Sequence, residues 1–353
     1  MPNSQHNAYL HARVSAQAGH LLSSADARQL PHLDLEQIGR RFGLEAMLDE
    51  SISASARNRA VERALIRTLM QELSLLIRPM DGGTRELVLY WARKFELYNL
   101  KALIRGKLSG LNEQAIEDNL YDVPDALALP HKALLRTESV LELLRQLEQS
   151  PYRVIAGQAR QVFEERHEPF ALEATIDQSY YAGLLKRVRQ LEDVDRREMQ
   201  RVVGLILDQL NLVWLLRYRF SYGLSASETY YQLVPSFRKL HRNVLLELVN
   251  MSEFEKVIQA LPHPLEQVLD GTTSTVEVES RMETHNAGEL RKVLRDSPSS
   301  VSRALAYLVL RELDLKKLFA AIQGKILQLD PLLLKFAVSG DNATDQVEAG
   351  SGV

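Results

Sequence analysis

Residues 95–105 read FELYNLKALIR, and this stretch decides the fold because the chain repeats its pattern twice. Residues 207–217 read LDQLNLVWLLR, and residues 310–320 read LRELDLKKLFA. In each stretch the apolar residues recur at intervals of three and four, which places them on one face of an α-helix. A pattern that returns at wide spacing indicates a repeated architecture. We therefore expect three related helical units.

A second pattern precedes each of these stretches and supports the repeat. A glutamate follows an apolar residue, and two further apolar residues return at helical spacing on the same face. The three copies are Glu62 with Leu65 and Leu73, Glu173 with Ile176 and Leu184, and Glu279 with Met282 and Leu290. Each glutamate stands at a similar distance ahead of the repeated stretch that follows it, residues 95–105, 207–217 or 310–320. Each unit should therefore begin with two long helices.

A third element closes each unit with a helix stop and a helix start. Residues 110–112 (GLN) and 223–225 (GLS) place a glycine at a helix end and a capping side chain just after it. Ser225 and Glu228 have the spacing of a capping box. The third copy has Asp330 before Pro331 in a looser register. The first two units then share a further predicted helix, over residues 139–149 and 243–261.

Composition agrees with a soluble all-α protein. Of 353 residues, 45% are hydrophobic and 25% charged, the balance of an ordinary globular chain. Proline is absent from Phe170 to Val234, a span too long for strands and typical of consecutive helices. The chain has no cysteine, which excludes disulfides and thiolate chemistry. A net charge of -3 lacks the basic footprint of a nucleic-acid binder.

The sequence predicts no membrane-spanning helix and no signal peptide. The most apolar stretch, residues 202–216, is interrupted by Asp208, and a spanning helix needs roughly 18 uninterrupted apolar residues. The first six residues are polar and lack the charged and apolar regions of a signal sequence. Contact with a membrane should therefore come through partners or a surface of the protein, and not through insertion.

Motifs of catalysis and metal binding are missing from the sequence. It contains no Walker-type phosphate loop and no His-Glu-x-x-His pair, and its nine histidines are scattered. We therefore predict no catalytic residue, cofactor or metal. An all-α enzyme stays open as an alternative, and it would need a buried pocket with convergent ionisable groups.

The candidate functional residues are polar positions that recur inside the predicted helices. Asn99, Asn211 and Asp314 fall at one position of the repeat, and Glu62, Glu173 and Glu279 at another. A structural role, tying the helices of each unit together, is the stronger interpretation for the asparagines. Repeated cations form the candidate partner interface: Arg105 and Arg217, with Ala320 in the third copy, and Lys107 and Arg219. For these cations a solvated face and a partner contact stay equally open.

The same residues resemble a known family. Residues 96–110 (ExxNLKxLxRxKLSG), with the opening Tyr9-Leu10-His11-Ala12-Arg13-Val14, are similar to the central-stalk adaptor of V-type and A-type ATPases, called the C subunit in prokaryotic enzymes and the d subunit in the eukaryotic V-ATPase. Residues 208–225 fit its second copy. Ala306-Tyr307-Leu308, Glu312 and Gly324-Lys325 fit its third. The likeness covers about Tyr9 to Val338, and it departs from the pattern at Asp314 and Ala320.

This resemblance implies a fold and a function. Family members are all-helical funnels of three similar units around a pseudo-threefold axis. As peripheral rotor subunits, one copy per complex, they sit on the cytoplasmic face of the proteolipid c-ring. They receive the central shaft, made of the D-type and F-type subunits. Such a chain would transmit torque for ATP-coupled proton or sodium transport without catalysis. The alternative is a soluble helical-repeat scaffold for protein–protein interaction, which would form an open solenoid.

The expected organisation follows from the repeat boundaries. We predict a flexible N-terminus over residues 1–8. Unit one should span residues 9–168 with extra N-terminal helices, unit two residues 169–270, and unit three residues 271–338. The small, polar residues 339–353 should form a disordered tail.

Overall fold

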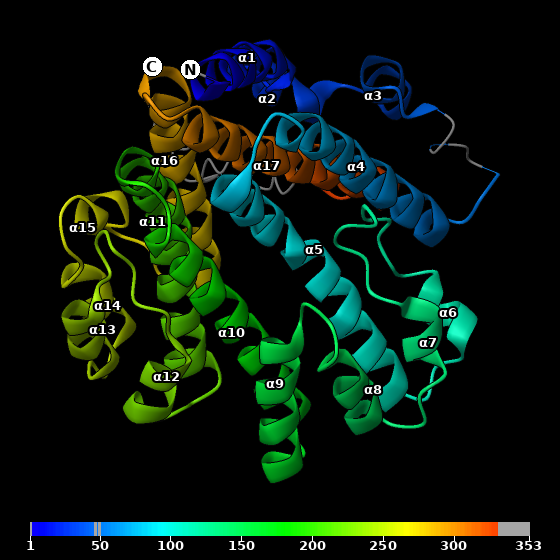
Figure 1. Ribbon diagram of the computed structural model, residues 1–353, viewed down its shortest axis with the longest axis vertical. Coiled ribbons are helices and arrows are strands. Elements are labelled where there is room, and N and C mark those ends of the chain that lie inside the picture. Colours follow the sequence, from blue (N-terminus) through cyan, green and yellow to red (C-terminus); the bar gives the residue numbers. More distant parts are fainter. Residues whose placement is uncertain (1, 46–47, 49–50, 331–353) are drawn as a thin grey trace, which may run out of the picture. The chain divides into compact units, whose positions relative to one another are not determined.

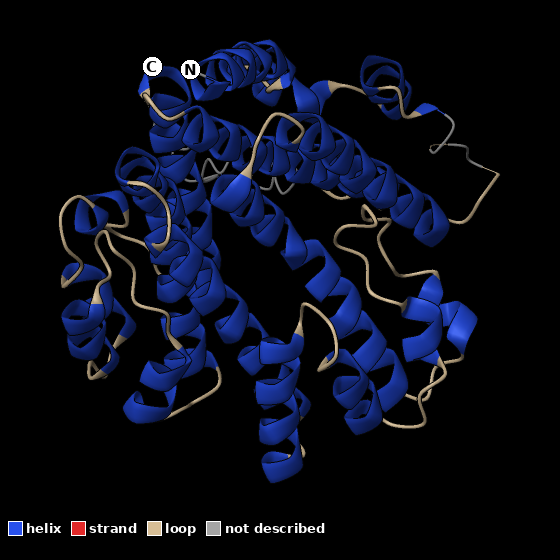
Figure 2. Cartoon of the chain, in the orientation of Figure 1, coloured by secondary structure: helices blue, strands red, loops and turns tan. Residues whose placement is uncertain are grey.

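The computed structural model describes residues 2–45, 48 and 51–330. Throughout this part of the chain the regular elements are helices, and no strand occurs (Figure 2). The all-α expectation is therefore confirmed. The predicted tail, residues 339–353, lies outside the described residues.

Three pairs of long helices carry the repeated patterns (Figure 1). The pairs are α4 (Ala54–Ile77) with α5 (Gly82–Leu108), α10 (Pro169–Arg189) with α11 (Asp193–Leu216), and α16 (Thr275–Asp296) with α17 (Ser300–Ile326). Local signals set the starts of these helices. The side chains of Ser53 and Ser299 accept hydrogen bonds from backbone N–H groups in the first turns of α4 and α17. Pro169 occupies the first position of α10. Helix α11 continues into a π-helical turn, Arg217–Ser221.

The second long helix of each pair ends in the same way. Gly110, Gly223 and Gln328 adopt left-handed backbone angles, with φ of 66°, 69° and 52°. The residue that follows each of them in the chain donates its N–H to a carbonyl in the last turn of the helix. Glycine is favoured there because it has no Cβ to strain. The predicted stops at Gly110 and Gly223 are confirmed, whereas the third copy uses a glutamine that sequence punctuation does not reveal.

These helix ends also correct the register of the third repeat. Glu96 and Asp314 stand at the same distance before Gly110 and Gln328, so Asp314 is equivalent to Glu96 rather than to Asn99. Asp208 lies one residue further from Gly223, and the π-helical turn accounts for that residue. The sequence alignment of Asp314 with Asn99 and Asn211 is therefore displaced by three residues.

Shorter helices fill the rest of the chain. In the N-terminal part they are α1 (Pro2–Gln17), η1 (Ala18–His20), α2 (Ser24–Gln29), η2 (Leu30–His32) and α3 (Leu35–Phe42). After α5 come α6 (Glu113–Glu117), α7 (His131–Leu135), α8 (Val140–Leu147) and α9 (Arg153–Arg166). After α11 come α12 (Ala226–Gln232), α13 (Arg242–Val249), α14 (Phe254–Gln259) and α15 (Leu265–Val268).

Sequence signals locate several of these short helices. The capping box of Ser225 and Glu228 and the Asn112 cap of α6 are present. Helix α8 fulfils the prediction for residues 139–149, but residues 243–261 form two helices instead of one. The Asn250 amide donates to the Leu246 carbonyl at the end of α13, which helps to stop the helix there. The sequence predicts that the first helix starts at about Tyr9. In the structure α1 begins earlier, at Pro2.

The chain packs as two compact units. The first takes in the described residues of 1–78 and 280–353, and there α17 packs against α1, α3 and α4. Every residue from Val301 to Leu310 is buried in this unit. The second unit comprises residues 79–279, in which α10 packs against α5, α9 and α11. These packing units do not follow the boundaries of the three repeats, which rest on the sequence pattern.

The segment Asp193–Ser221 is long enough to cross a membrane, and an 18-residue window within it is apolar enough, with a mean hydropathy of 1.2. Two thirds of its most apolar window (67%) is nevertheless buried inside the protein. Asp208 and Asn211 within it are fully buried and bond to the backbone of residues 234–240. Its apolar character is therefore that of a core helix of the second unit.

Candidate functional site

Two of the predicted cations, Arg105 and Arg217, link consecutive repeats. Arg105 Nε lies 3.3 Å from Glu173 Oε1, and Arg217 Nη2 lies 2.8 Å from Glu279 Oε2. Each arginine comes from the second long helix of one repeat, and each glutamate from the first long helix of the next. The sequence pattern marks all four residues without pairing them. Both arginine side chains stay about half exposed (53% and 44%), so they remain accessible to a partner.

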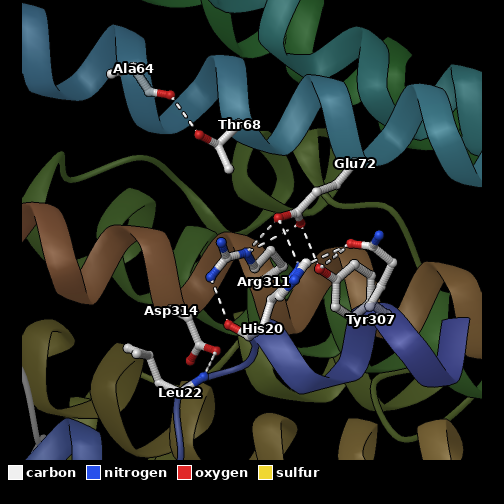
Figure 3. A network of polar contacts seen from close by, with 9 residues as sticks. His20, Leu22, Ala64, Thr68, Glu72, Tyr307, Arg311 and Asp314 are labelled. Carbon is white, nitrogen blue, oxygen red and sulfur yellow. Dashed lines mark hydrogen bonds and ion pairs between the residues drawn. The ribbon is translucent and has the colours of Figure 1, made fainter. Parts of the chain in front are cut away.

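The junction between the last and the first repeat has different chemistry (Figure 3). Glu72 of α4 is buried and accepts a 2.6 Å hydrogen bond from the Tyr307 hydroxyl of α17. Arg311 of the same helix donates from Nε to both Glu72 oxygens, at 3.1 and 3.2 Å. Burial, followed by the bond to Glu72, raises the pKa of the Tyr307 hydroxyl above its usual value. The phenol therefore acts only as a proton-bearing donor at physiological pH.

The N-terminal segment completes this network. Arg311 Nη1 donates to the His20 carbonyl at 2.9 Å, and the Leu22 N–H donates to Asp314 Oδ2 at 2.8 Å (Figure 3). Burial raises the pKa of the Asp314 carboxyl, which the Leu22 bond opposes. Sequence patterns do not mark Glu72, Tyr307 and Arg311 as a site, because their partners lie at opposite ends of the chain.

The other two predicted cations, Lys107 and Arg219, bind backbone carbonyls. Lys107 Nζ donates to the Leu135 and Thr137 carbonyls, at 2.7 and 2.6 Å. Arg219 donates from Nε to the Val249 carbonyl at 3.0 Å and from Nη1 to the Leu224 carbonyl at 2.6 Å. Leu135 and Val249 are the last residues of α7 and α13. These cations therefore satisfy carbonyls that a helix end leaves unpaired.

A buried acid precedes each of these cations on the same long helix. Glu96 accepts from the Leu129 N–H at 2.6 Å and also contacts His131 Nε2. Asp208 accepts from the Leu240 N–H at 2.9 Å, and burial raises the pKa of its carboxyl against these bonds. Both acids are fully buried. They lie three residues before Asn99 and Asn211, so the same repeat that predicts the asparagines also contains the signal for these acids.

Asn99 and Asn211 each hold one peptide of the segment that follows. The Asn99 amide donates to the Tyr121 carbonyl at 3.0 Å and accepts from the Tyr121 N–H at 2.7 Å. Asn211 makes the same pair of bonds with Val234, at 2.8 and 2.9 Å. Both side chains are fully buried. Since an amide supplies both a donor and an acceptor, asparagine fits this position better than aspartate.

The described part of the chain holds few features of a reaction centre. No group of three or more His, Asp and Glu residues there could hold a metal ion. A surface cavity of about 500 Å³ lies in the second unit, lined by residues that include Arg166, Glu168, Phe170, Glu228 and Tyr231. The pKa of Glu228 is lowered by the Ser225 hydroxyl, a bond that belongs to the cap of α12. The titration of Glu228 is thus explained by helix capping.

Comparison with known proteins decides the family. A sequence model described as "ATP synthase (C/AC39) subunit" matches residues 10–335. The chain belongs to this family. The resemblance seen in the sequence is thereby confirmed, over nearly the same span.

Curated relatives agree with this assignment. The A-type ATP synthase C subunit of Methanocaldococcus jannaschii is 24% identical, over 92% of this chain and 84% of the relative. The proteins of the same name from Methanosarcina barkeri and Thermococcus kodakarensis are each 24% identical over 93% of this chain, and the matches cover 91% and 88% of those proteins. The similarity therefore extends over most of this chain and most of each relative.

Proposed function

We propose that this protein is a subunit of a V/A-type rotary ATPase and couples its central shaft to its membrane ring. One copy per complex would sit at the cytoplasmic face of the proteolipid c-ring and receive the D- and F-type shaft subunits. It would transmit torque for ATP-coupled proton or sodium transport and catalyse no reaction itself. Membership of the ATP synthase (C/AC39) subunit family and relatives named as the C subunit of A-type ATP synthase support this assignment.

The structural observation that carries the proposal is the packing of the last repeat on the first. Helix α17 packs against α4 and α1, and buried Glu72 joins α4 to α17 through Arg311 and Tyr307. In an open solenoid each repeat contacts only its sequence neighbours. Contact between the first and last repeats therefore favours a closed, funnel-like arrangement of three units over the general scaffold.

The internal bonding suits a part that must carry torque. Each second long helix is fixed to the segments around it by buried side chains that bind backbone groups, as Asn99, Asn211 and Asp314 do. Closely packed helices have low compressibility and transmit strain. We propose Arg105 and Arg217 as the accessible members of the shaft or ring interface, because Lys107 and Arg219 are engaged with carbonyls of this chain.

Assembly with purified components tests this function. Detergent-solubilised c-ring and shaft subunits are mixed with and without this protein, and complexes are separated by size. We expect one complex that contains ring, shaft and this chain, and no ring–shaft complex in its absence. Ring and shaft that associate to the same extent without this protein would refute the proposal.

A further inference from the structure

The first two repeats share a clasp that holds a short helix against the long one. In repeat one, the buried carboxylate of Glu96 accepts a hydrogen bond from the N–H of Leu129, two residues before α7. Lys107 donates to the carbonyl of Leu135, the last residue of α7. In repeat two, Asp208 accepts from Leu240, again two residues before α13, and Arg219 binds the carbonyl of its last residue, Val249. Acid and base are equally spaced on both long helices.

The electrostatics of this clasp are those of a helix dipole held at both ends. An anion near a helix N-terminus and a cation at its C-terminus are both stabilising. The acid and the base are separated by a rise of roughly 16 Å along the long helix, which suits a short helix lying beside it. The acidic side chains also satisfy backbone N–H groups that would otherwise be buried without a partner.

The third long helix carries the same acid and base, but the segment they hold comes from the other end of the chain. Asp314 and Lys325 of α17 have the spacing of Glu96 and Lys107. Asp314 accepts from the N–H of Leu22, two residues before α2, at 2.8 Å. Lys325 Nζ donates to the carbonyl of Pro31 at 2.8 Å, within η2, which continues directly from α2. All three N–H donors are leucines.

We propose that residues 18–42, the N-terminal strap, are the missing closing element of the third repeat. The strap docks on α17 as α7 docks on α5 and α13 on α11, although no peptide links it to the end of α17. The third repeat is then built from segments near both ends of the chain, the strap and α17. This inference goes beyond the proposed function and does not depend on it.

Other contacts extend the docking along α17. Ser300 Oγ donates to the Asn7 carbonyl and Arg303 Nη2 to Ser15 Oγ, so the polypeptide from α1 onward follows α17 in the same direction. Leu30 and Ile38 of the strap are buried, at 1% and 0% exposure. The strap is therefore integral to the first compact unit and is positioned by Asp314 and Lys325.

Hydrogen exchange of the full-length protein tests the strap. The double variant Asp314→Leu with Lys325→Met removes both ends of the clasp, and we expect exchange of residues 18–42 to rise by about tenfold or more. Exchange in α7 and α13, which have their own clasps, should stay at the wild-type rate. Lys316→Met is the matched control, because this exposed lysine of α17 pairs with its helix neighbour Glu312. Wild-type protection of residues 18–42 in the double variant would overturn the proposal.

A circular permutant keeps the test decisive if the double variant fails to fold. The permuted chain runs from residue 51 to 353, through a flexible linker, and on through residues 1–50. Because the proposal assigns the strap to the third repeat, we expect the permutant to fold with wild-type protection of residues 18–42. Loss of that protection, with α7 and α13 still protected, would show that the strap belongs to the first repeat.

Discussion

The junctions between repeats differ in where their charges lie. Arg105–Glu173 and Arg217–Glu279 are ion pairs at the surface of the second unit. At the junction of α17 with α4, the Glu72 side chain is 8% exposed and the Arg311 side chain 13%, and Tyr307 adds a third bond. Consecutive repeats are joined by the chain itself, so exposed pairs suffice there. The long helices α4 and α17 of the first and last repeats lie far apart in the sequence, and a buried polar network joins them.

The largest expected effect follows from breaking that buried network. Glu72→Ala leaves the Arg311 guanidinium without its anion in a buried site, which should destabilise the first unit by about 3–5 kcal/mol. Adding Arg311→Met removes the stranded charge and should recover part of the loss. Denaturant unfolding of the single and double variants measures both effects. If Glu72→Ala unfolds like the wild type, the network contributes nothing to closure.

An intermediate effect is expected inside a repeat. Asn211→Ala removes both bonds to Val234 and leaves a buried N–H and carbonyl unpaired, which should cost about 2–4 kcal/mol. Asn99→Ala is the matched change in repeat one. The exposed Asn119→Ala, a side chain that donates to a carbonyl of its own helical turn, serves as the control. Equal stability of Asn211→Ala and Asn119→Ala would contradict a clasping role for the buried amide.

The pH dependence of stability tests the burial of the Asp208 carboxyl. Burial raises the pKa of Asp208, so its proton is bound more tightly in the folded than in the unfolded chain. The stability of the wild type relative to Asp208→Asn is thus highest below the unfolded pKa of about 3.9 and falls as pH rises through the folded pKa. Unfolding of both proteins across this range measures the difference. If the stability of the wild type relative to Asp208→Asn instead increased as pH rose, the result would contradict a raised pKa for Asp208.

The smallest effect on stability is expected at the exposed pairs. Arg105→Glu with Arg217→Glu should destabilise the fold by only about 1–2 kcal/mol, because exposed ion pairs contribute little. If these arginines face the shaft or ring, the same variant should uncouple ATP hydrolysis from ion movement. Circular dichroism and ATP-driven transport measure the two properties. Full coupling in a well-folded variant would remove both arginines from the interface.

Sequence patterns predicted the helix pairs because amphipathic spacing, serine caps and the glycines at 110 and 223 are local signals. The third helix end was hidden because Gln328 replaces glycine, and this displaced Asp314 in the alignment. The sequence marks Arg105 and Glu173 at two separate recurring positions. That these two residues pair with each other is visible only in the fold. The sequence does not indicate that Glu72, Tyr307 and Arg311 are partners, because their contacts join residues more than two hundred positions apart.

Lys107 and Arg219 show why repeated cations alone do not identify an interface. A cation near the end of an amphipathic helix can face solvent or a partner, and composition does not separate the two. In the structure each reaches the carbonyl end of a neighbouring short helix. That requirement depends on where α7 and α13 lie, which is a property of the tertiary fold.

The proposed coupling role is tested most directly by ATP-driven ion transport in rebuilt vesicles. Membranes containing the c-ring and stator receive the catalytic head and shaft, with or without this protein, at equal ATPase activity. We predict that ions move in proportion to ATP hydrolysed only when this protein is present. Transport at the same ratio in its absence would contradict the account.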